Sequence, residues 1–198
     1  MVWSSIEIFG TQLIGFFVSI VLARLLLPEE FGLIAMITVF IGIGNVLINS
    51  GLSLSLIRSK NIDEEDFSTV FYFNLFVSIF IYLIIFLLAP LISDFFNQSV
   101  LCVLIRVYGF TFIIDSFSTI QLTRLTIKLD FKSQMLVALP SIIIGSLFGI
   151  VMAYSGFGVW SLVWMSVLKS LILVASIYYK IKWIPLRVFN IKKFKHHY

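Results

Sequence analysis

The chain has 198 residues, of which 60% are hydrophobic and 12% are charged, and its mean hydropathy is +1.09. Because an average soluble domain carries about a quarter charged residues, this composition excludes a water-soluble globular protein. The single cysteine, Cys102, excludes an internal disulfide framework and a CxxC redox or zinc motif. The composition therefore predicts a protein whose solvent is lipid.

Long uncharged runs divide the chain into six predicted membrane spans. A membrane-spanning helix needs about 20 largely apolar residues, and the runs 31–57, 67–93 and 133–168 contain no Asp, Glu, Lys or Arg. The last run is too long for one span and is divided at its glycine-containing segment YSGFG, residues 154–158. Lipid offers no partner for unpaired backbone groups, so the spans are predicted as α-helices, and the lack of alternation argues against a β-barrel. In chain order, the predicted helices lie near residues 4–27, 32–57, 68–93, 100–124, 133–154 and 158–181.

The basic residues at the ends of the spans and between them are distributed unevenly. Eleven Lys and Arg residues lie in the connection between the second and third helices, in the connection between the fourth and fifth helices, and in the tail, which are all on one side of the membrane. On the opposite side there is only Arg24. Loops rich in Lys and Arg stay in the cytoplasm, so both termini are predicted to be cytoplasmic. The acidic residues 63–66 are interpreted as stabilising the N-terminus of the third helix. Residues 1–183 are thus predicted to form one six-helix transmembrane unit, followed by a basic cytoplasmic tail at 184–198.

Polar or small residues form continuous stripes along four of the predicted helices. Small residues four positions apart let membrane helices approach closely, so the stripes of the first and fifth helices are assigned to packing. Amides and a carboxylate exceed what packing requires, so the stripes of the second and fourth helices are expected to face the bundle interior or water. From the first, second, fourth and fifth helices in turn, the stripes are Gln12, Gly15, Ser19 and Ala23; Thr38, Gly42, Asn45, Asn49 and Ser53; Tyr108, Thr111, Asp115 and Ser118; and Ser141, Gly145 and Gly149.

Three charged residues lie well inside predicted spans. Arg106 and Asp115 are nine residues apart, about 13 Å along the helix axis and half a turn out of phase, so they are not expected to pair. Arg106 lies near the outer end of its span, where its side chain could reach the headgroups. Lys169 differs from Asp115 in depth by only about 5–6 Å, a gap that a lysine side chain covers. We hypothesise that Asp115 and Lys169 face one polar interior and pair there, with a purely structural buried pair as the alternative.

Several segments, in one order along nearly the whole chain, carry a resemblance to a known family. They are SIVLARLLLPEEFGLIAMITVF at 19–40, INSGLSLSLIRSK at 48–60, STVFYFNL at 68–75, APLISDFF at 89–96, LDFKSQML at 129–136 and GFGVWSLV at 156–163. In these segments the chain resembles bacterial polysaccharide flippases of the multidrug/oligosaccharidyl-lipid/polysaccharide (MOP) superfamily, of the colanic-acid-exporter and O-antigen-flippase type. The resemblance implies an all-α integral membrane fold, with six transmembrane helices forming one lobe of a MATE-like transporter. It also implies translocation of undecaprenyl-pyrophosphate-linked repeat units across the bacterial inner membrane by alternating access.

The same resemblance implies roles for polar residues of the spans. Cationic side chains would contact the pyrophosphate or acidic sugars, amides would hydrogen-bond sugar hydroxyls, and the carboxylate would tune the cations or carry a coupling H⁺ or Na⁺. The implied partners are the lipid-linked oligosaccharide and membrane lipids, with no cofactor, no metal and no nucleic acid. The predicted substrate-path residues are the cations Arg24 and Lys169, the amides Asn45, Asn49 and Asn74, and the carboxylate Asp115.

Two features depart from the family pattern. Relatives have 12 or 14 helices in two similar lobes, whereas six are predicted here, and relatives usually have a short basic segment before the first helix, where this sequence has MVWSS. The segment IPLRVFNIKKFKHHY at 184–198 resembles the basic linker to a seventh helix. The expectation is an N-terminal lobe that needs a C-terminal lobe or a second copy as its partner. A drug or cation antiporter of the same superfamily and a non-transporting remnant are the alternatives. A membrane enzyme is not expected, because both histidines lie in the last three residues and no convergent catalytic set is recognisable.

Overall fold

The computed structural model of the chain describes residues 2–48, 56 and 63–186, and within these ranges every regular element is an α-helix. Among the described residues, six helical segments are long and apolar enough to cross a membrane, with α5 and α6 together making one of them. This confirms the predicted all-α, multi-pass membrane fold. The elements are α1 (Val2–Leu25), α2 (Pro28–Ile48), α4 (Glu64–Phe95), α5 (Ser99–Gly109), α6 (Thr111–Ile127), α7 (Phe131–Tyr154) and α8 (Trp160–Ile181).

Both α2 and α4 begin four residues before their predicted starts, and the fourth predicted span is not one continuous helix. α4 has 32 residues and begins four residues before the predicted start, because Asp63 and Asp66 form a capping box in which the Asp66 carboxylate accepts a hydrogen bond from the Asp63 N–H at 2.8 Å. The acidic residues therefore lie in the first turn of the helix, as predicted, where they offset its positive end. The fourth span is interrupted at Phe110, between α5 and α6. The predicted end of the second helix, at residue 57, lies outside the described residues.

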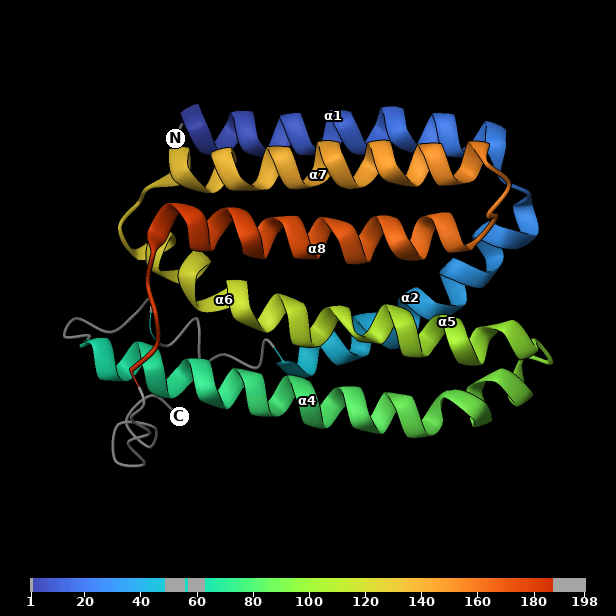
Figure 1. Cartoon of the computed structure of the whole chain (residues 1–198), viewed down its shortest axis with the longest axis horizontal. Coiled ribbons are helices and arrows are strands. Elements are labelled where there is room, and N and C mark those ends of the chain that lie inside the picture. The colour runs from blue at the N-terminus through green and yellow to red at the C-terminus, as the bar shows by residue number, and fades with distance from the viewer. Residues whose placement is uncertain (1, 49–55, 57–62, 187–198) are drawn as a thin grey trace.

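The helices lie roughly side by side in a layered bundle. Figure 1 shows α1 next to α7, α7 next to α8, and α8 next to α6, with α4 beyond α5 and α6; α2 contacts α4 and α5. A buried core between α2, α4, α5 and the start of α8 includes Ile37, Ile85, Leu104 and Val163. An apolar stripe at helical spacing stays exposed on α4, as expected for a lipid-facing surface: Phe76, Phe80, Leu83, Leu87 and Leu91.

Glycines bring α7 and α8 close together. A Cβ atom added at Gly145 would lie 3.0 Å from the Lys169 Cβ and 3.1 Å from the Met165 carbonyl oxygen, and one at Gly149 would lie 2.8 Å from the Met165 Cβ. The packing prediction for the stripe of this helix is therefore confirmed. For the first helix it is wrong within this chain, because a Cβ at Gly15 would meet nothing within 4 Å. Small residues permit close approach but do not enforce it. The α1 residues that pack against α7 and α8 include Val18 and Leu22.

Arg106 on α5 is held against α4 rather than left free in the span. Its Nε donates a long hydrogen bond, 3.5 Å, to the Phe86 carbonyl oxygen, and its guanidinium carbon lies 4.2 Å from the centre of the Phe86 ring. Phe86 precedes Pro90 by four residues, and proline has no N–H to donate to the carbonyl four residues earlier. An unpaired carbonyl is costly in lipid. The contact therefore favours a structural role for Arg106 over the headgroup interpretation.

This arrangement predicts coupling between Arg106 and Pro90. Arg106→Leu is expected to destabilise the protein by about 1–3 kcal/mol, because the Phe86 carbonyl loses its charged donor. In a Pro90→Ala background the new N–H donates a hydrogen bond to the Phe86 carbonyl, so Arg106→Leu should destabilise the protein by about 1 kcal/mol less. A double-mutant cycle by thermal unfolding in detergent measures the difference, and strictly additive effects would contradict the proposed role.

Candidate functional site

A cavity of about 350 Å³ lies between α2, α5, α6 and α8, and we call it the polar cavity. The stripe predicted on the fourth span runs along its wall, and three apolar residues, Ile41, Leu122 and Leu173, complete the lining. The Ser118 and Thr119 hydroxyls donate to the Asp115 backbone oxygen at 2.9 Å each, which leaves their lone pairs free to accept from a ligand. The polar lining residues are Asn45, Tyr108, Thr111, Asp115, Ser118, Thr119, Ser166, Lys169 and Ser170.

Asp115 on α6 and Lys169 on α8 share this cavity. The Asp115 carboxylate interacts with the Ser170 hydroxyl and is attracted by the Lys169 charge. No hydrogen bond or ion pair joins Asp115 to Lys169, and the structure describes both side chains. The two groups thus share a polar interior, as hypothesised, but they attract each other at longer range rather than forming a contact pair.

A second cavity, of about 380 Å³, lies where α1, α7 and α8 meet, and we call it the α1 cavity. The stripe of α1 lines it with Gln12, Gly15 and Ser19, which explains why Gly15 has open space around it. Two residues of α8, Ser166 and Lys169, line both cavities. The Ser166–Lys169 segment of α8 therefore separates two neighbouring hollows.

The other predicted substrate-path residues lie elsewhere. Arg24 is exposed in the last turn of α1, where a cation offsets the negative helix end. Asn74 is buried in α4, with 3% of its surface exposed. Neither residue lines the polar cavity or the α1 cavity. Asn49 lies outside the described residues. The roles of Arg24, Asn49 and Asn74 thus remain predictions.

Sequence reasoning missed two serines of α8. Ser166 and Ser170 flank Lys169, and all three line the polar cavity. Their spacing of three and one places them on one face of an apolar helix. The signal that identified the other polar stripes was therefore present here as well.

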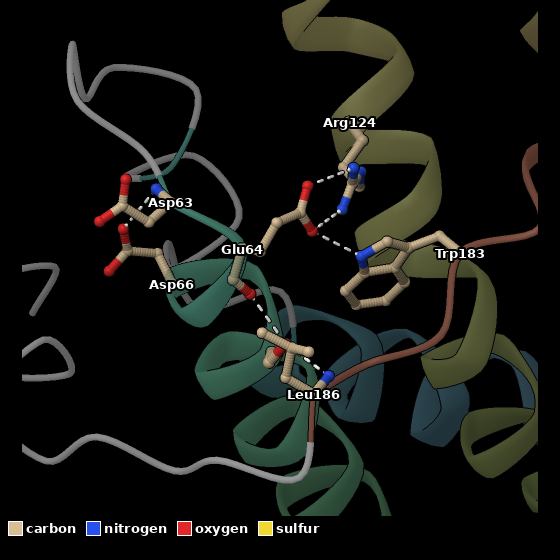
Figure 2. A network of polar contacts seen from close by, with 7 residues as sticks. Asp63, Glu64, Asp66, Arg124, Trp183 and Leu186 are labelled. Atoms are coloured by element: carbon tan, nitrogen blue, oxygen red, sulfur yellow. Dashed lines mark hydrogen bonds and ion pairs between the residues drawn. The ribbon is translucent and has the colours of Figure 1, made fainter.

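A second polar cluster lies at the start of α4, and we call it the α4 clamp. Figure 2 shows the Glu64 carboxylate between Arg124, at the end of α6, and Trp183, in the segment after α8. The Arg124 guanidinium donates two hydrogen bonds to Glu64, at 2.6 and 2.8 Å, and the Trp183 indole N–H donates a third at 2.7 Å. The backbone N–H of Leu186 donates to the Ser68 hydroxyl at 2.9 Å. The clamp thus ties the segment after α8 to α4 and α6.

Residues 2–48, 56 and 63–186 contain no group of three or more His, Cys, Asp and Glu side chains that could hold a metal ion. The candidate site is therefore defined by the hydroxyls, amide, carboxylate and ammonium group of the polar cavity. These groups suit the binding of a polar, hydroxyl-rich ligand.

Comparison with known proteins supplies the context for this geometry. Over residues 21–198 the chain matches a family described as polysaccharide biosynthesis protein. It is 23% identical over 191 residues to the succinoglycan biosynthesis transport protein ExoT of Rhizobium meliloti (strain 1021), which covers 96% of this chain and 39% of that protein. No solved structure matches the chain.

Two further relatives each align over 112 residues at 30% identity, covering 57% of this chain and 23% of the relative. One is an uncharacterized membrane protein in the cps region of Klebsiella pneumoniae, and the other is the lipopolysaccharide biosynthesis protein WzxC of Escherichia coli (strain K12). The chain thus spans less than half the length of each of these curated relatives.

Proposed function

Because the chain belongs to the polysaccharide biosynthesis protein family, we propose that it is one lobe of a flippase that moves lipid-linked polysaccharide repeat units across the bacterial inner membrane. The observation that carries this proposal is the polar cavity inside an otherwise apolar helix bundle. Polar and charged groups are expensive within a membrane and usually line a substrate or ion path. The names of two relatives, a succinoglycan biosynthesis transport protein and a lipopolysaccharide biosynthesis protein, support polysaccharide as the substrate class.

The cavity residues have separable roles in this proposal. Asn45 and the hydroxyl groups bind sugar hydroxyls, since amides and hydroxyls both donate and accept hydrogen bonds. Lys169 binds the anionic phosphate that joins sugar to lipid. Asp115 offsets the positive charge of Lys169 while the cavity is empty. It is also the group available to bind a coupling H⁺ or Na⁺. The proposal involves no catalytic step and no cofactor.

Alternating access requires a second lobe on the open side of the cavities. Thr38, Gly42 and Asn45 form an exposed polar and small stripe on α2, and a Cβ at Gly42 would meet nothing within 4 Å. Such a stripe suits cover by another helix better than contact with lipid. We propose a second six-helix lobe, from the same protein or from a second copy, as that cover. The asymmetry of the basic residues supports an orientation with both ends of the lobe in the cytoplasm.

The decisive test is a cavity substitution in the complete gene, in a bacterium that depends on it for surface polysaccharide. Lys169→Met is expected to lower export by at least about tenfold, because the phosphate loses a charged contact worth more than about 1.4 kcal/mol. Surface polysaccharide and lipid-linked repeat units retained in the membrane are both measured.

Lys180→Met is the matched control, because Lys180 lies on the same helix but lines neither cavity. Normal export with Lys169→Met would overturn the role of Lys169. Normal export after the whole gene is deleted would overturn the proposed function.

A further inference from the structure

The two cavities differ in the chemistry of their walls. In the polar cavity nine of the twelve lining residues carry a polar or charged side chain. In the α1 cavity six of the thirteen lining residues are polar or charged, but most of the exposed wall surface is apolar. Two of its hydroxyls, those of Thr11 and Ser19, donate to carbonyl oxygens of their own helix at 3.0 and 2.8 Å. Its apolar lining residues are Val18, Leu22, Phe31, Ile142, Leu162 and Met165. The α1 cavity therefore suits a ligand group that is largely hydrocarbon.

Lys169 is the cation at the junction of these two environments. Its Cα and Cβ pack closely against Gly145 of α7, with 3.0 Å between the Lys169 Cβ and the place where a Cβ at Gly145 would stand. The base of the side chain is thus fixed between two helices, while its four-carbon chain can carry the ammonium group toward either cavity. Asp115 attracts that ammonium from the side of the polar cavity.

We propose that the two cavities and Lys169 together hold the substrate across its lipid–sugar junction. The α1 cavity binds the isoprene units next to the phosphate, Lys169 binds the pyrophosphate, and the polar cavity binds the first sugars. This proposal rests on the proposed function and adds to it a site for the lipid part of the substrate. The order hydrocarbon, anion, polyol along the ligand matches the order apolar wall, cation, polar wall along the protein.

The volume of the α1 cavity limits how much of the lipid it holds. About 380 Å³ is at the lower end of the range for small-ligand pockets, so only the isoprene units nearest the phosphate fit. The remainder of the chain then passes over α1 into the bilayer. α1 is suited to this, because Phe16 and Phe17, next to cavity-lining Gly15, are exposed by 60% and 63%.

The test uses the full chain in phosphatidylcholine nanodiscs and a short prenyl pyrophosphate that carries a diazirine on its phosphate-proximal isoprene unit. After illumination, mass spectrometry locates the label. It is expected on residues 11–22 of α1 and at Ile142 or Ser146 of α7, and an excess of undecaprenyl pyrophosphate should remove it. Lys169→Met should lower this labelling at least about tenfold, and Lys169→Arg should retain most of it. Phe80 on α4 and Leu147 on α7, both exposed, report unspecific contact with membrane lipid.

Three outcomes would overturn the proposal. The first is label spread over Phe80 and Leu147 as strongly as over the α1 cavity. The second is labelling of the α1 cavity that is indifferent to Lys169→Met. The third is loss of label when phosphatidylglycerol is added in amounts that match undecaprenyl pyrophosphate, which would make this a general phospholipid site. In each case the proposed function stands if Lys169→Met still blocks export in the cell, so the two failures can be told apart.

Discussion

Replacing Gly145 with leucine is expected to push α7 away from α8 and to destabilise the protein by about 1–3 kcal/mol, the usual cost of overpacking. The first atom of the new side chain would stand 3.1 Å from a backbone oxygen of Met165 and 3.2 Å from the Lys169 Cα. Neither atom can move without shifting α8 itself. Because Lys169 is one of the residues displaced, the same substitution should reduce export as well as stability.

Thermal unfolding in detergent measures this effect, with a thiol-reactive dye that reports exposure of the single, half-buried Cys102. Gly32→Leu is the matched control, because a Cβ at Gly32 would meet nothing within 4 Å and Gly32 is not part of the α2 stripe assigned to contact with a second lobe. The control should unfold near the wild-type temperature. Equal unfolding temperatures for Gly145→Leu and Gly32→Leu would contradict the packing that the structure describes.

The spans were readable from the sequence because lipid imposes a simple rule on them. Every backbone group must be paired within a helix, so the uncharged runs marked the membrane segments. The end of a helix depends on local capping, which hydropathy does not register. The α4 helix therefore begins at Glu64, inside the acidic cluster, instead of at the first uncharged residue. The interruption at Phe110 likewise falls within a continuous apolar run.

The candidate site was only partly predictable, because helix periodicity tells which residues share a face but not what that face meets. Asn45, Asp115 and Lys169 do line one cavity, as their polarity in apolar helices suggested. The stripe of α1 looked equally suited to packing, and only the position of α7 shows that Gly15 borders a cavity. Arg106 carried the same signal as Asp115, yet its partner is a carbonyl freed by a proline on another helix.

Glu64→Ala is expected to release the segment after α8 from the rest of the lobe. An exposed ion pair contributes little on its own, and 54% of the Glu64 side chain is exposed. The α4 clamp is stronger than such a pair, because Arg124 is only 12% exposed and its guanidinium carbon also lies 4.6 Å from the Phe67 ring and 4.9 Å from the Trp183 ring. Removing Glu64 leaves that largely buried cation without its carboxylate, at an expected cost of about 1–2 kcal/mol.

The Leu186 amide is the reporter, since its N–H reaches the Ser68 hydroxyl only while the segment lies against α4. Its hydrogen exchange is expected to rise by about fivefold to thirtyfold in Glu64→Ala, in step with an opening free energy lowered by about 1–2 kcal/mol. Glu29→Ala is the control, because Glu29 also stands in the first turn of a helix, α2, and is exposed. Arg124→Lys should behave like a weakened form of Glu64→Ala, because lysine cannot make the two parallel bonds that arginine makes here. If Leu186 exchanges equally slowly in the wild type and in Glu64→Ala, then the Glu64 carboxylate contributes nothing to the position of the segment, which Trp183 packing and the Leu186–Ser68 hydrogen bond hold without it.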